Sequence, residues 1–178
     1  MKTIVLREAG YDEAMLGLSL SYNQDVKNMP KVARKLTKRG GSHEKFLESI
    51  AIWLDVTAPR YWWSQFDTYR IGVTKQSEST MHTILNRPLG KEDFEHSDIY
   101  APHLKSLNTL IARGDFDSVK RHLPEAFLQR RIVCTNYKAM KNIYKQRIDH
   151  KLREWQEFLM DVVLCLEHPE FIVQKEGV

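Results

Sequence analysis

The chain has 178 residues, of which 42% are hydrophobic and 28% are charged, with 27 Lys and Arg against 23 Asp and Glu. This balance predicts one globular domain over residues 1–178 and excludes a disordered, collagenous or linker-like chain. The apolar runs are far shorter than the roughly 20 residues of a membrane-spanning helix, and Arg7 and Glu8 lie where a signal peptide has its apolar segment. We therefore expect a cytoplasmic protein that makes no contact with a membrane.

The first half of the chain alternates extended and helical patterns. In chain order these patterns predict an edge strand, three helices, a strand and a fourth helix, over residues 1–6, 12–20, 26–39, 42–50, 50–57 and 60–66. Gly40 and Gly41 end the second helix, and Pro59 separates the strand from the fourth helix. Residues 74–80 are polar and predict a loop in which a ligand can meet the backbone.

The second half is more helical. Helices are predicted over residues 91–96, 103–113 and 116–122, and an extended segment over 127–134. The longest predicted element is a helix from about Asn136 to Leu166, which contains neither Gly nor Pro. Together these elements predict an α+β domain, with a small mixed or antiparallel sheet, flanking helices and a long C-terminal helix.

At about 100° per residue the predicted long helix has an apolar face and a polar face. The apolar face carries Tyr137, Met140, Tyr144, Ile148, Trp155, Phe158, Leu159, Val162 and Leu166, and the polar face carries Lys138, Lys141, Asn142, Lys145 and Asp149. Arg147 at the edge and Lys151 inside the apolar face break this pattern. Because an unpaired buried charge is costly, each either reaches past the apolar side chains to water, pairs with an acid across a subunit contact, or holds a ligand. So long an apolar face also predicts an oligomer.

Positive charge is concentrated in residues 118–153, which hold ten Lys and Arg against two acids. That segment is either a solvated basic face or a site for a phosphorylated small molecule or a nucleic-acid backbone. A second basic and aromatic cluster comprises residues 60–63, Phe66, Tyr69 and Arg70. It is either core packing or a wall against which a flat heterocycle stacks.

The common site motifs are absent from the sequence. Its seven His show no HxxxH or HExxH spacing, so no metal site is predicted. GxGxxG, GxxxxGK[ST] and GxSxG are also absent. Cys134 and Cys165 are 31 positions apart in apolar contexts and are expected to be reduced packing residues.

Two C-terminal segments, LIARGDFDSVKRHLPEAF and TNYKAMKNIYKQRIDHKLREWQEF, resemble the flavin-dependent thymidylate synthases. The first has the family's basic residue before Leu-Pro, here Lys120, and the second has its long helix. Upstream, LSLSYN, GGSHEKFLES and DVTAPRYWWSQF follow the family's order, and the last ends in the expected Gln. The family's RHRxxS element corresponds to TYRIGVTKQSESTMH, in which Arg70 matches the second Arg, while Thr68, Tyr69 and Val73 replace the first Arg, the His and the Ser.

The resemblance implies a homotetramer with FAD at subunit interfaces beside the deoxyuridine nucleotide dUMP. It implies that dUMP becomes dTMP, with methylenetetrahydrofolate and NADPH as co-substrates, and that Arg147 is the catalytic residue that polarises the uracil ring. The implied nucleotide-binding residues are Gln65, Ser77, Glu78, Ser79, Lys120 and Arg147, and the implied cofactor-binding residues are Arg70, Asn136, Lys138, Asn142 and Lys151. Two alternatives stay open: the same fold with a lost or changed reaction, and a basic nucleic-acid-binding protein.

Overall fold

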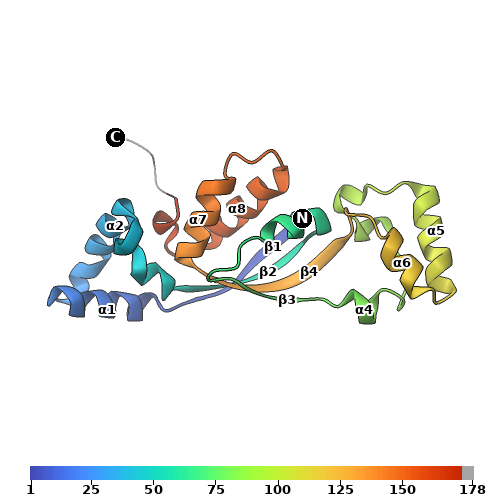
Figure 1. The fold of residues 1–178 in the computed structure, drawn as a ribbon. Coiled ribbons are helices and arrows are strands. Elements are labelled where there is room, and N and C mark those ends of the chain that lie inside the picture. Colours follow the sequence, from blue (N-terminus) through green and yellow to red (C-terminus); the bar gives the residue numbers. More distant parts are fainter. Residues whose placement is uncertain (174–178) are drawn as a thin grey trace.

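A computed structural model describes residues 1–173, which fold around one four-stranded antiparallel sheet (Figure 1). The strands are β1 (Lys2–Ala9), β2 (Ala51–Pro59), β3 (Thr74–Ser77) and β4 (Leu128–Asn136), and their order in the sheet is β1-β2-β4-β3. β2 and β4 pair along their whole lengths, from Ala51 with Asn136 to Pro59 with Leu128. This central pair forms the long axis of the molecule, with β1 and β3 as the sheet edges.

The helices lie along one face of the sheet and at its two ends (Figure 1). The α-helices are α1 (Tyr11–Tyr22), α2 (Met29–Arg39), α3 (Arg60–Phe66), α4 (Thr80–Thr83), α5 (Ala101–Ala112), α6 (Phe116–His122), α7 (Tyr137–Arg147) and α8 (Arg153–Cys165). The 3₁₀ helices are η1 (Val26–Asn28), η2 (Gly41–Glu48), η3 (Lys91–Asp93), η4 (Glu95–Ser97) and η5 (Pro169–Phe171). α3, α7 and α8 cover the sheet, α1 and α2 form one end, and α4 to α6 form the other (Figure 1). Within residues 1–173, none of the helices combines the length and apolar character needed to span a membrane.

The aromatic cluster after β2 is core packing. Trp62, Trp63 and Phe66 are fully buried between the sheet and α8, where Trp155 reaches within 4.8 Å of Trp62 between ring centroids. A second, smaller apolar core fills the other end of the molecule and contains Ile84, Leu89, Phe94, Leu107, Ile111, Val119, Leu123 and Phe127. The sheet is therefore anchored at its centre by aromatic side chains that contact one another.

Most predicted elements are confirmed, but the predicted loop over residues 74–80 is wrong in its first half. Thr74 to Ser77 form β3, which pairs with β4 from Cys134 to Arg131. Its polar composition reflects an edge strand with one partner, whose side chains are mostly exposed. The other differences are smaller: residues 42–50 and 91–96 form 3₁₀ turns, and 26–39 divides into η1 and α2.

The single C-terminal helix is also wrong. α7 ends at Arg147, the chain turns over residues 148–152, and α8 begins at Arg153. This break lets α8 fold back beside α7, so that Trp155 and Phe158 join the aromatic core (Figure 1). As a result Lys151 lies exposed in the turn instead of inside an apolar face.

Two further side-chain predictions need correction. Lys141, expected on the polar face of the long helix, is 2% exposed. Both cysteines are free as expected, but Cys165 is exposed and is not a packing residue.

Gly72 and Gly17 are expected to respond oppositely to alanine. Gly72 has φ +70°, and a Cβ there would lie 2.8 Å from Nδ2 of Asn136, so Gly72→Ala should reduce the free energy of unfolding by about 1–2 kcal/mol. Gly17 lies within α1 with open space around its Cβ position, so Gly17→Ala should increase it by about 0.5–1 kcal/mol. Urea unfolding of both variants measures the two shifts, and shifts of the same sign would contradict this placement of the two residues.

Candidate functional site

The helix α7 begins directly where β4 ends, and this junction places several predicted site residues. Asn136 is the last residue of β4 and the N-cap of α7, where its Oδ1 accepts a hydrogen bond from the backbone N–H of Ala139 at 2.9 Å. Tyr137, Met140 and Ile143 are buried against the sheet. The opposite side of α7 is therefore open, and it carries Lys138, Asn142 and Lys145.

Two adjoining cavities lie along this open side of α7, each of about 460 Å³. Ile71, Ala139 and Asn142 line both of them, and Ile71 is 93% exposed. The first cavity is also lined by Tyr69, Arg70 and Gln146, and the second by Glu44, Glu48, Gly72, Asn136, Lys138, Lys141 and Lys145. Four of the five predicted cofactor-binding residues therefore line these two adjoining cavities. Lys151 lines neither of them.

Ion pairs fix one wall of the second cavity. Nζ of Lys138 lies 2.5 Å from Oε1 of Glu48. Lys141 pairs with Glu44, with both side chains buried, and its Nζ also donates to the carbonyl oxygen of Thr37 at 2.7 Å. Burial lowers the pKa of Lys141, and the hydrogen bond to Glu44 opposes that shift. This buried pair joins α7 to η2 and α2.

Tyr69, Gln65 and Trp155 hold Arg147 at the end of α7, and we call these side chains the arginine cage. Its Nε donates to the Tyr69 hydroxyl at 2.8 Å, and its Nη1 lies 3.4 Å from Oε1 of Gln65. The guanidinium carbon is 4.7 Å from the ring centroid of Trp155 and 5.5 Å from that of Tyr69. Trp155 Nε1 donates to the same Gln65 oxygen at 2.9 Å. These contacts fix the plane of the guanidinium, and no acid within residues 1–173 pairs with it, so its positive charge stays available to a ligand.

The nearby turn is sensitive to this charge. The His150 ring lies 6.2 Å from that of Trp155 between centroids, and its Nδ1 accepts from the backbone N–H of Leu152 at 3.1 Å. Burial, and then the positive charge of Arg147, lower the pKa of His150. The turn therefore keeps His150 neutral near neutral pH, which preserves its hydrogen bond to Leu152.

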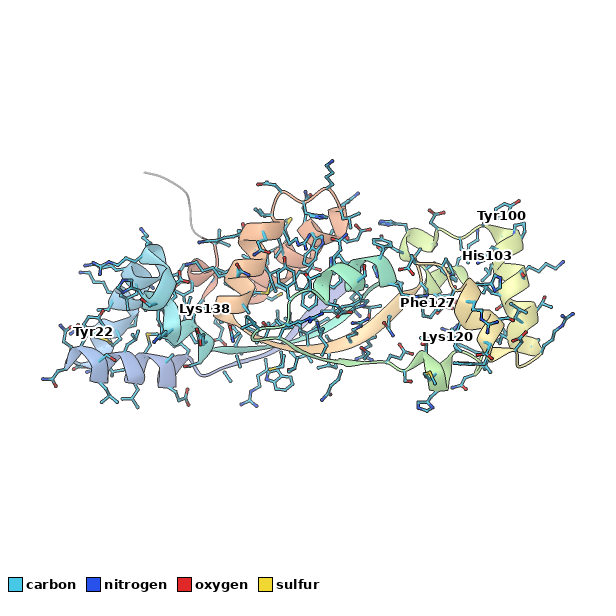
Figure 2. All side chains as sticks on the ribbon, in the orientation of Figure 1. Tyr22, Tyr100, His103, Lys120, Phe127 and Lys138 are labelled. Atoms are coloured by element: carbon cyan, nitrogen blue, oxygen red, sulfur yellow. The ribbon has the colours of Figure 1, made fainter. Side chains whose placement is uncertain are left out.

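A second group of predicted residues lies at the other end of the sheet. Ser77, Glu78 and Ser79 lead from β3 into α4, and Nζ of Lys120 donates to the Thr80 hydroxyl at 2.5 Å. Glu78 also lines a cavity of about 500 Å³ with Arg87 and Arg130. Figure 2 shows Lys120 at this end and Lys138 toward the opposite end. One chain therefore does not bring the predicted phosphate-binding and flavin-binding residues together.

The basic segment 118–153 is not a continuous exposed face. Arg130 makes two hydrogen bonds to Asp55, which hold the pKa of that carboxyl below its usual range. Arg131 contacts Asp67 at 2.9 Å and stacks 4.3 Å from the Trp63 ring. Lys138, Lys141 and Arg147 are also engaged, as are Lys120 with Thr80 and Arg153 with Glu157. Seven of the ten cations therefore have partners within residues 1–173.

One set of potential metal ligands lies outside these cavities. Glu95, His96 and Glu154 each bring a ligand atom to within 4.8 Å of the others. The amino group of Met1 is 2.6 Å from Oε1 of Glu95, and the Tyr61 hydroxyl donates to Glu154. Both carboxylates therefore have a partner of their own, and the prediction that the chain binds no metal stays a prediction.

Two members of the arginine cage are not among the predicted site residues. The sequence pattern predicts Trp155 on the apolar face of one long helix and Tyr69 in an aromatic cluster. The turn over residues 148–152 brings Trp155 back to Arg147, and the available sequence signal was the cation Arg147 at the edge of an apolar face.

Comparison with known proteins identifies the fold. No family model matches the sequence, and no curated protein is similar to it. A solved structure of the flavin-dependent thymidylate synthase ThyX from Helicobacter pylori, complexed with FAD and dUMP, matches with a TM-score of 0.79 and 16% identity over 97% of this chain and 98% of that chain. A second Helicobacter pylori ThyX structure with FAD and dUMP matches with a TM-score of 0.81 and 17% identity over 97% of each chain. The chain therefore has the ThyX fold, and the predicted α+β class is confirmed.

The buried pair of Lys141 and Glu44 is expected to stabilise the wall of the second cavity. Glu44→Ala leaves a buried, unpaired ammonium and should reduce the free energy of unfolding by about 3–5 kcal/mol. The matched control is Glu48→Ala, which removes the exposed pair with Lys138 and should change stability little. Guanidinium unfolding of both variants tests this difference, and equal losses would show that the Lys141 pair is not special.

Proposed function

We propose that this protein is a flavin-dependent thymidylate synthase, which methylates dUMP to dTMP with FAD as cofactor and with methylenetetrahydrofolate and NADPH as co-substrates. The observation that carries the proposal is the arginine cage. It holds Arg147 beside the cavities of α7, in a fold shared with a protein solved with FAD and dUMP.

The residues along α7 fit a flavin cofactor. The amides of Asn136 and Asn142 offer donors and acceptors for the polar edge of a ring, and exposed Ile71 offers an apolar contact. Lys138 and Arg70 offer positive charge for a pyrophosphate. Bound flavin supplies hydride chemistry, whereas the protein supplies binding, orientation and electrostatics.

Arg147 is the residue that we assign to the uracil ring. In the described part of the chain its Nε and Nη1 are used by Tyr69 and Gln65, which leaves Nη2 for a pyrimidine carbonyl. Among residues 1–173 this guanidinium has no acid partner to offset its positive charge. It therefore stabilises negative charge that develops on the ring as the pyrimidine reacts.

The nucleotide phosphate is assigned to Lys120 and the segment from Ser77 to Ser79. Lys120 supplies charge, and the serines supply hydroxyl donors. Ser77 pairs with Arg131, which lies five residues before Asn136 on β4, or about 17 Å of extended chain. Lys120 contacts Thr80, which lies beyond the end of β3 and farther from Asn136, so the separation is longer than a mononucleotide.

We therefore propose a homotetramer in which the phosphate-binding residues of one protomer lie beside Arg147 of another. Large apolar side chains that are 40–53% exposed on the sheet support subunit contacts, namely Ile4, Leu6 and Trp53. Such an assembly would form each active site between subunits.

One observation favours the second candidate, a nucleotide-binding protein with a lost or changed reaction. At the positions that match the RHRxxS element, the Tyr69 hydroxyl already accepts a hydrogen bond from Arg147. Val73 is a buried apolar side chain with no polar atom to offer a ligand. Thr68 donates to the Gln65 carbonyl oxygen at 2.7 Å. These side chains offer fewer ligand contacts than the residues that they replace.

Cofactor binding gives the first test. We expect protein mixed with FAD and passed through gel filtration to keep the visible flavin bands at the mass of a tetramer, and those bands to shift when dUMP is added. Adding methylenetetrahydrofolate and NADPH should then produce dTMP. Bound flavin without dTMP would support the second candidate, whereas a colourless protein would contradict both flavin-binding candidates.

The role of Arg147 gives the second test. Arg147→Ala removes a charged donor and should weaken dUMP binding by roughly 10-fold to 100-fold, measured by calorimetric titration with FAD present. Lys105→Ala is the control, because Lys105 is an exposed cation on α5 that does not line the cavities described above, and its dUMP affinity should stay within about twofold. Equal losses in the two variants would rule out the assignment of Arg147 to the uracil.

A further inference from the structure

We propose that α2 binds the phosphate backbone of a nucleic acid. Residues 26–43 contain six Lys and Arg and no Asp or Glu, a local charge of +6 that leaves −2 for the rest of a chain whose net charge is +4. All six are exposed, and we call them the α2 basic face: Lys27, Lys31, Arg34, Lys35, Lys38 and Arg39. None of them lines the cavities along α7.

The geometry of α2 arranges these charges along one side. Met29, Ala33, Leu36 and Thr37 are buried against the core, and at 100° per residue the cations fall on the opposite side. Lys31, Lys35 and Arg39 follow one another by a turn each. From Lys31 to Arg39 the helix rises about 12 Å, which spans three or four phosphates of one strand at about 3.4 Å per charge.

Most of these charges have no acid partner in the described part of the chain, unlike many of those in residues 118–153. Within residues 1–173, Arg34 alone of the six has an ion-pair partner, Glu170 at 3.4 Å, and both side chains are well exposed. In residues 118–153 the cations without an acid partner among the described residues are divided between α6 and the region of α7, whereas those of the α2 basic face lie together. A dense positive patch in which one cation of six is paired with an acid suits non-specific binding of a nucleic-acid backbone.

The way α2 is fixed favours nucleic acid over a lipid surface. Its apolar face is buried, and Lys141 Nζ holds the Thr37 carbonyl oxygen at 2.7 Å, so α2 has no apolar face to insert into a bilayer. Tyr22 ends α1 at the same end of the molecule, and its ring is 43% exposed (Figure 2). An exposed aromatic ring beside a basic stripe suits a strand whose bases stack.

The test is fluorescence anisotropy of a fluorescein-labelled oligouridylate of about 20 nucleotides at several KCl concentrations between about 50 and about 200 mM. The triple variant Lys31→Gln, Lys35→Gln, Lys38→Gln should weaken binding at least tenfold at low salt. It should also reduce the slope of log K against log [KCl] by about 2, since each lost phosphate contact contributes about 0.7 for single strands.

The matched control is Lys91→Gln, Lys105→Gln, Arg113→Gln, which removes three exposed cations from the other end of the molecule and gives the same net charge. Its affinity should stay within about twofold of the parent. Circular dichroism checks that the variants fold. If the first triple variant does not fold, a second triple variant, Lys27→Gln, Arg34→Gln, Arg39→Gln, tests the α2 basic face independently.

Three outcomes would overturn the proposal. The first is no binding of oligouridylate at about 50 mM KCl, or equal losses in the α2 and control variants. The second is binding of phosphatidylserine vesicles without binding of oligouridylate, which would assign the face to a membrane. The third is displacement of oligouridylate by excess dUMP, which would place the oligonucleotide in the nucleotide site; retention in excess dUMP supports a separate surface and does not depend on the proposed enzymatic function.

Discussion

The antiparallel pairing of β2 with β4 is the constraint on which the arrangement of this protein depends. β2 leads into α3 and so to Gln65 and Tyr69, while β4 leads into α7 and so to Asn136 and Arg147. Because the strands run in opposite directions, α3 and α7 start from opposite ends of the sheet and approach each other over its covered face. The same strand length keeps Lys120, which precedes β4, far from the groups that follow it. The central pair therefore brings together one group of the predicted site residues and separates it from the other.

The arginine cage depends on a second constraint, the return of the chain after Arg147. A straight helix would carry Trp155 about 12 Å beyond Arg147 along its axis. The turn over residues 148–152 instead lets one indole ring pack on Trp62, stack against a guanidinium and donate to Gln65. Core packing and the orientation of a charged group thus use the same side chain, so the site is as rigid as the core that supports it.

Local patterns in the sequence were sufficient for the central strands and most helices, because branched, aromatic and capping residues act over a few positions. They were insufficient where distant residues decide the outcome. The break after Arg147 contains no Gly or Pro and follows from burial of Trp155, and the burial of Lys141 follows from Glu44, which is 97 positions away. β3 is polar because it is an edge strand. The family resemblance placed Arg147 and most of the predicted cofactor-binding residues on one predicted helix, but no sequence pattern showed that Lys120 lies at the other end of the sheet.

The buried ammonium of Lys141 joins the wall of the second cavity to α2, so that the two form one structural unit. It contacts Glu44 from η2 and the backbone of Thr37 from α2 while lying among the residues that line the cavity. A ligand that orders this unit changes the binding free energy of any other ligand that requires the unit to be ordered. By thermodynamic linkage the two effects are equal in size, whichever ligand binds first. A cavity ligand that changed the order of Lys141 would therefore change the affinity of the proposed nucleic-acid face on α2 by the same factor.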